Sequence, residues 1–154
     1  MGIEHKSRVG KLVLAAVVAI PLQSGQPWQV LKYRSIPPNQ VEFSPAGLSI
    51  QVKSSASPVI YPLPSSIRLK SLRVAGKISG TLQLPGAQVQ GSKGADDYQL
   101  RIGLVLKGNQ RLNFVQRAVA ADWVVKLFEL APKNVGIDRI LFLNATHVEK
   151  AVGT

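Results

Sequence analysis

The chain has 154 residues and a formal net charge of +11, from 19 Lys and Arg against 8 Asp and Glu. Its length fits one domain with one hydrophobic core, and its content of 45% hydrophobic and 18% charged residues excludes an intrinsically disordered chain. Because the chain has no cysteine, disulfides, thiolate catalysis, zinc–thiolate sites and a lipid-modified leader are excluded as well.

The first 25 residues have the three parts of a signal peptide. A basic stretch at 6–11 precedes an apolar run at 12–20, and Ser24 and Gly25 offer small side chains for cleavage. The apolar run is shorter than the roughly 20 residues that span a bilayer. We therefore expect a signal peptide at 1–25, a periplasmic or secreted location, and no stable membrane span after cleavage. An uncleaved anchor and a buried N-terminal strand are the alternatives.

Beyond this leader, residues 26–154 are expected to form a single β-rich domain. Apolar and polar residues alternate in the way that places one face of a strand in the core. This alternation occurs at 48–52, 72–78 and 98–107. Pro45-Ala46-Gly47 predicts a hairpin turn between 41–43 and 48–52.

An amphipathic helix is predicted at about 113–131. Its apolar residues recur at helical spacing, at Val115, Val119, Trp123, Leu127 and Leu130. Asn113 and Gln116 resemble a capping box, and Pro132 is expected to end the helix. Asp122 and Lys126 are spaced for an i,i+4 ion pair. We expect Trp123 to pack in the core.

The segment 137–144 is apolar on both faces, which predicts a central strand covered on both sides. Several alternating strands and one helix predict a fold that is mainly β. An antiparallel β-sandwich of jelly-roll-like type, with one amphipathic helix, fits this pattern best.

Three stretches are distinctive together, at 28–36, 55–63 and 93–102. The second reads Ser-Ala-Ser-Pro-Val-Ile-Tyr-Pro-Leu, and the third reads Lys-Gly-Ala-Asp-Asp-Tyr-Gln-Leu-Arg-Ile. They resemble an uncharacterised family of bacterial exported β-sandwich proteins, similar in turn to galactose-binding-like jelly rolls. Ala95 interrupts the Gly-Asp-Asp typical of that family. The resemblance covers about 28–144 and implies an exported domain that is shortened at its C-terminus, with no established activity.

Asp96 and Asp97 are the only adjacent pair of carboxylates in the sequence. Neighbouring residues on a strand point to opposite faces, so the pair does not suit the facing acids of a glycoside hydrolase. With backbone carbonyls and Asn144, the two carboxylates would supply the oxygen ligands of a calcium ion. The alternative is a structural role, in which they cap loop amides or pair with Arg101.

The remaining candidates for ligand binding are one basic and two aromatic residues. The planar guanidinium of Arg101 suits an anionic sugar or a carboxylate, and an ion pair with Asp96 or Asp97 is the alternative. Trp28 and Tyr61 are candidates for stacking on a sugar ring, and core packing is the alternative. No phosphate-binding loop, dinucleotide fingerprint or zinc-protease motif occurs in the sequence. We expect no catalytic residue and no cofactor, apart from the possible calcium.

The sequence therefore favours an exported, non-catalytic binding or accessory domain for an anionic glycan or another envelope component. An envelope protein-interaction subunit that pairs through a sheet edge is one alternative. A hydrolase that uses Asp96 or Asp97 is a lesser one. The Lys and Arg residues form no continuous run, and no series of aromatic residues alternates with them. The sequence therefore carries no specific signal for nucleic acid.

Overall fold

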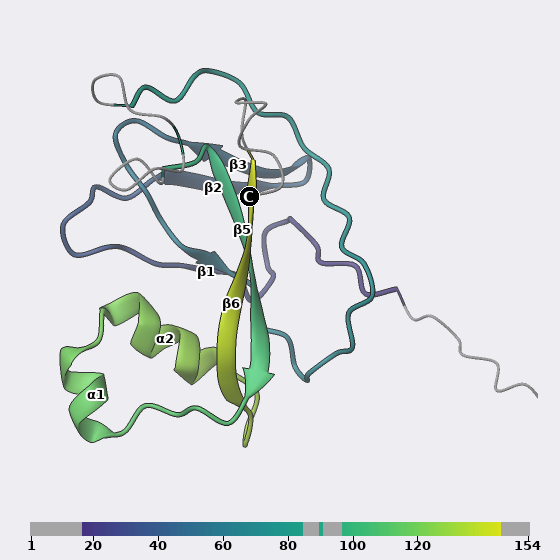
Figure 1. The fold of residues 1–154 in the computed structure, drawn as a ribbon. Helices are drawn as coiled ribbons and strands as arrows, with labels where there is room; N and C mark the ends of the chain where they lie inside the picture. Colours follow the sequence, from purple (N-terminus) through teal and green to yellow (C-terminus); the bar gives the residue numbers. More distant parts are fainter. Residues whose placement is uncertain (1–16, 85–89, 91–96, 146–154) are drawn as a thin grey trace, which may run out of the picture.

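The computed structural model describes residues 17–84, 90 and 97–145. In this part of the chain the protein is mainly β, and its strands form three antiparallel pairs. The strands that pair are β1 (Gln29–Val30) with β4 (Val59–Ile60), β2 (Gln40–Ser44) with β3 (Gly47–Gln51), and β5 (Leu100–Gly108) with β6 (Gly136–Ala145). Two helices, α1 (Phe114–Val119) and α2 (Asp122–Leu130), connect β5 to β6 and lie beside one end of the β5–β6 ribbon (Figure 1).

The predicted hairpin is confirmed as β2 and β3. Their register pairs Val41 with Ile50, so residues of like polarity stand opposite one another. Gly47 closes the turn with φ +126, a backbone conformation that residues with a Cβ rarely adopt. The Ser44 hydroxyl also accepts a hydrogen bond from the amide of Ala46 at 3.2 Å. Turn chemistry at this position thus fixes both the existence and the register of the hairpin.

The strands predicted at 98–107 and 137–144 are confirmed as β5 and β6, the longest pair. Their register runs from Leu100 opposite Ala145 to Gly108 opposite Gly136, with an irregularity between Val105 and Lys107. At the far end of the ribbon the two backbones approach closely. A Cβ built on Gly108 would lie 2.5 Å from the amide nitrogen of Asp138. Glycine is therefore required where the ribbon ends.

The prediction of a central strand at 137–144 is wrong. Among the described residues β6 pairs with β5 alone, and its residues Leu141, Phe142 and Leu143 are 44–48% exposed. An apolar run on both faces shows that a strand can be buried on both sides. Burial itself needs neighbouring elements, and the described part of the chain does not supply them.

The prediction of a strand at 72–78 is also wrong. These residues are exposed and have no strand partner among the described residues. Alternating apolar and polar residues indicate what the two faces of a strand would be. A strand also needs a neighbouring strand with which to form hydrogen bonds. The segment instead runs as an open trace along the side of the molecule opposite the helices (Figure 1).

The predicted helix exists, but it is broken into two. Ala120 and Ala121 adopt extended backbone conformations, with ψ of 154° and 143°, between α1 and α2. The capping box is confirmed, because Asn113 Oδ1 accepts from the backbone N–H of Gln116 at 2.8 Å and Gln116 Oε1 accepts from the backbone N–H of Asn113 at 2.9 Å. The expected end is confirmed too, since α2 stops at Leu130, two residues before Pro132.

The predicted ion pair between Asp122 and Lys126 is wrong. The break places Asp122 in the first turn of α2, where Arg34 reaches it at 3.3 Å. Lys126 pairs with Glu129 instead, also at 3.3 Å. Within the residues described, Leu127 and Ile137 are the two buried hydrophobic side chains. Trp123, which was expected in the core, is only half-buried.

Candidate functional site

Trp28 and Tyr61 lie together in an aromatic cluster with Phe43. The pairing of Gln29 with Ile60 brings the residues that flank β1 and β4 side by side, so the two rings meet edge to face at 5.0 Å between centroids. Phe43 lies 5.8 Å from Trp28, and the indole N–H donates to the carbonyl of Pro21 at 2.7 Å. These contacts give both rings a packing role that joins β1, β4 and the β2–β3 hairpin. Stacking on a sugar remains a prediction.

Arg101 is held on the face of the β5–β6 ribbon. Its guanidinium carbon lies 5.1 Å from the centre of the Tyr98 ring and 5.2 Å from that of Phe142. Its Nε donates at 2.9 Å to Oδ1 of Asn144, the residue opposite it on β6. The structure thus places Arg101 with two rings and an amide, an arrangement that sequence reasoning did not find, because it depends on the strand register.

Of the adjacent carboxylates Asp96 and Asp97, the structure describes only Asp97. Asp97 is exposed, and its backbone carbonyl accepts from Nε2 of Gln90 at 2.9 Å. Asp96 lies outside the described residues, so the predicted calcium site there stays a prediction. No group of three His, Cys, Asp or Glu lies within reach of one metal ion in the described ranges.

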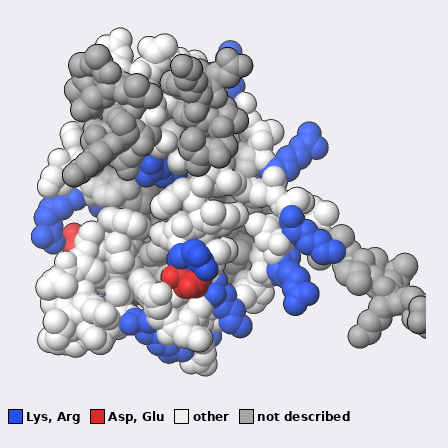
Figure 2. Space-filling model, in the orientation of Figure 1, with Lys and Arg blue, Asp and Glu red and all other residues white. Residues whose placement is uncertain are grey.

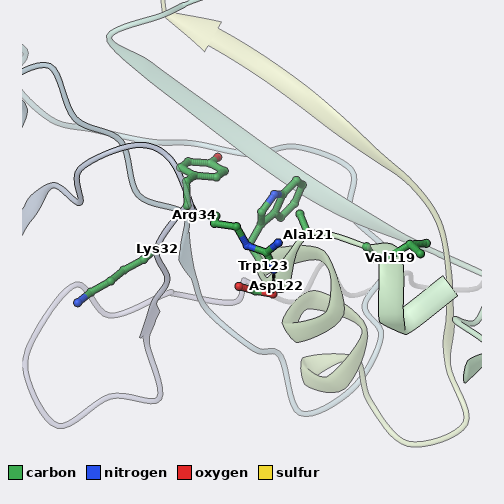
Figure 3. Close-up of a pocket in the computed structure, with 8 residues that line it drawn as sticks. Lys32, Arg34, Val119, Ala121, Asp122 and Trp123 are labelled. Carbon is green, nitrogen blue, oxygen red and sulfur yellow. Dashed lines mark hydrogen bonds and ion pairs between the residues drawn. The ribbon is translucent and has the colours of Figure 1, made fainter. Parts of the chain in front are cut away.

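An open pocket of about 270 Å³ lies where the segment after β1 meets the start of α2 (Figure 3). Tyr33 and Trp123 line it, edge to face at 6.2 Å, and the Arg34–Asp122 ion pair crosses its rim. The side chains of this ion pair are 81% and 74% exposed, so it contributes little to stability. Lys32 points away from Trp123, so among the described residues that line the pocket no cation without an acidic partner is directed into it (Figure 3). The geometry is that of a packing contact between two distant segments.

The connection between β4 and β5 carries basic residues and no acidic residue over most of its length. From position 43 to position 95 the sequence has six Lys and Arg and no Asp or Glu. Four of these residues are exposed and follow one another along the open segment, at Arg68, Lys70, Arg73 and Lys77. None of the four takes part in an ion pair within the part of the chain that the structure describes. On the face that Figure 2 shows, Lys and Arg side chains project along this edge of the molecule, and no acidic side chain of the described residues lies among them.

We name residues 64–80 the basic segment. Sequence reasoning missed it because it treated the basic residues as scattered and because it expected a half-buried strand at 72–78. The signal that identifies it is the long interval without acidic residues, which is visible in the sequence. Its exposure is visible only in the structure.

The described residues contain no helix that combines the length and the apolar character needed to cross a membrane. Comparison with protein-family models, with curated proteins and with solved structures finds no match in any of the three.

Proposed function

We propose that this chain is an exported, non-catalytic binding domain for an anionic glycan of the cell envelope, which the basic segment contacts. The observation that carries the proposal is the row of four exposed cations, Arg68, Lys70, Arg73 and Lys77, in a region without acidic residues. A surface of one charge attracts and retains polymers of the opposite charge.

The spacing of the charges favours a linear polymer over a small ligand. Nine peptide units separate Arg68 from Lys77, so the four cations extend over at most about 30 Å. A small anion would contact one or two of them, whereas an extended polyanion contacts all four at once. The basic segment has no aromatic side chain to stack on bases, which favours a glycan over single-stranded nucleic acid. Its exposed aliphatic residues, such as Leu72 and Val74, suit the apolar faces of sugar rings.

A β-sandwich of jelly-roll type, a periplasmic or secreted location and independence from cofactors are parts of the same proposal. Support for the sandwich is that every described strand pair is antiparallel, as both layers of such a fold require. Support for export is the pattern of charge and hydropathy at 1–25.

The test is binding to polygalacturonate, measured by isothermal titration calorimetry on the wild type and on a variant with Arg68, Lys70, Arg73 and Lys77 replaced by Gln. A contribution of about 0.5 kcal/mol per exposed contact predicts an affinity loss of roughly 30-fold. The matched control replaces four other exposed cations, Lys32, Lys53, Lys107 and Arg139, and therefore has the same net charge. We expect the control to lose less than about threefold. An equal loss in both variants, or no binding by the wild type, would reject the proposal.

A second function is favoured by one observation, the exposed apolar residues of β6. Leu141, Phe142 and Leu143 belong to a strand that has β5 as its partner on one side in the described chain. A two-stranded ribbon is marginal in water, and a partner's strand added at its edge would stabilise it. For such an interaction subunit, a photo-crosslinking residue at Leu141 should give one defined adduct in the envelope. The same residue at Val105 on β5 should give none, and equal adducts from both positions would argue against edge pairing.

A further inference from the structure

Helix α1 presents an apolar face that nothing in the described chain covers. Its residues Phe114, Val115 and Val119 are 86%, 68% and 81% exposed, and α1 has no buried residue. At about 100° per residue, these three and Ala118 fall within an arc of roughly 140°. Gln116 and Arg117 occupy the rest of the helix. The helix is therefore amphipathic, with its apolar side turned to solvent.

Local hydrogen bonds, and not packing, hold α1 in shape. The capping box closes its first turn, and the Ala120 amide donates to the Gln116 carbonyl at 2.9 Å at its end. An isolated helix of one or two turns is marginal in water, and most helices gain their stability by packing an apolar face. A surface that accepts this face would therefore stabilise α1 as well as bind it.

A basic pocket of about 330 Å³ adjoins this helix. Three cations line it, Arg111, Arg117 and Lys133, against one acid, Glu129. Arg117 lies 3.8 Å from Glu129, which also pairs with Lys126, so the acid is already balanced. Arg111 and Lys133 make no ion pair among the residues described. The pocket thus offers two uncompensated positive charges beside an exposed apolar helix.

We propose that α1 docks the protein onto an anionic phospholipid surface. The apolar face enters the boundary between headgroups and acyl chains, and Arg111 and Lys133 contact lipid phosphates. Charge complementarity favours lipid, because the first turn of α1 has no acidic residue and the flanking pocket is positive. A helix received by a protein groove commonly presents anchors over two or more turns, and α1 has six residues. In Figure 2 the corner of the molecule formed by α1 is white, with basic side chains beside it.

The test uses the absence of cysteine, which allows one probe to be placed on the full chain. Ala118→Cys on α1, labelled with a nitrobenzoxadiazole dye, should brighten and shift to the blue with vesicles of phosphatidylcholine and phosphatidylglycerol. Vesicles of phosphatidylcholine alone should give a much weaker response. The dye on Ser49→Cys of β3 is the control and should not respond. Because the dye reports α1 itself, binding of the leader to lipid does not produce the signal.

Two variants locate the contact. Phe114→Ser should abolish the response at α1. Arg111→Gln combined with Lys133→Gln should raise the lipid concentration needed by roughly 30-fold, at about five- to sixfold per charge. The variant of the basic segment should keep the full response, which separates this site from glycan binding. No response to anionic vesicles, an equal response from the dye on Ser49→Cys, or a response to protein concentration without lipid would each overturn the proposal. The last of these would assign the face to a second copy of the chain.

Discussion

Gly108 at the end of β5 is the position where a single methyl group should disturb the fold most clearly. A Cβ there would lie 2.5 Å, 2.6 Å and 2.7 Å from the N, Cα and Cβ atoms of Asp138. The first two atoms are backbone, so the contact cannot be relieved by a rotamer change, and the end of the β5–β6 ribbon must separate. Overpacking of this kind costs about 1–3 kcal/mol, and we expect Gly108→Ala to lower the free energy of unfolding by about 2 kcal/mol.

Two other glycines provide controls for the same substitution. A Cβ on Gly103 would lie 3.1 Å from side-chain atoms of Ile140 and Phe142, which can move, so we expect a change below about 1 kcal/mol. A Cβ on Gly76 would meet nothing within 4 Å, and Gly76→Ala should be neutral or slightly stabilising because it restricts the unfolded chain. Urea denaturation followed by circular dichroism measures all three. If Gly108→Ala unfolds at the same urea concentration as Gly76→Ala, the register of β5 and β6 is incorrect.

Substitutions at three further positions test individual contacts. Trp28→Ala should lower the free energy of unfolding in urea by about 2 kcal/mol, less than the 3–5 kcal/mol of a fully buried aromatic residue, because the ring is half-buried. Trp28→Phe should lower it by about 1 kcal/mol through loss of the hydrogen bond to Pro21. Unchanged stability of Trp28→Ala would show that the aromatic cluster does not stabilise the fold. Trp123→Ala should also cost less than about 3 kcal/mol, and a larger loss would show that the residue is core after all. Asn113→Ala removes the side-chain oxygen that accepts from the Gln116 backbone N–H, while the backbone N–H of residue 113 can still donate to Gln116 Oε1. Amide exchange in α1 should therefore accelerate by about fivefold for a loss of about 1 kcal/mol, with β2 and β3 as the unchanged reference.

Local chemistry made several elements predictable from the sequence. The β2–β3 hairpin follows from Pro45-Ala46-Gly47, where one residue must adopt a positive φ. The start of α1 follows from the reciprocal side chains of Asn113 and Gln116, and the end of α2 follows from Pro132. In each case the determining atoms lie within a few residues of one another, so the sequence contains the whole cause.

Features that depend on distant partners were not predictable. The break between the helices has no glycine or proline to mark it, and Asp122 finds its partner Arg34 at a separation of 88 residues. The segment 72–78 has the alternation of a strand but no edge to join in the described chain. The environment of Arg101 follows from the β5–β6 register, which sets Asn144 opposite it.

The candidate site was only partly accessible from the sequence, for a related reason. Net charge predicted an anionic partner, and the interval without acidic residues identifies the basic segment. Whether those cations face solvent or a neighbouring strand depends on strand pairing, and residues 72–78 have no strand partner within the described part of the chain.

The central claim, that the basic segment contacts an anionic glycan, is tested most directly by lysine acetylation read out by mass spectrometry. With polygalacturonate bound, Lys70 and Lys77 should be acetylated several-fold more slowly than in the free protein. Lys32, Lys53 and Lys107, which are also exposed but lie outside the segment, should react at unchanged rates. Equal protection of all five lysines, or protection of the three outside the segment alone, would contradict the account.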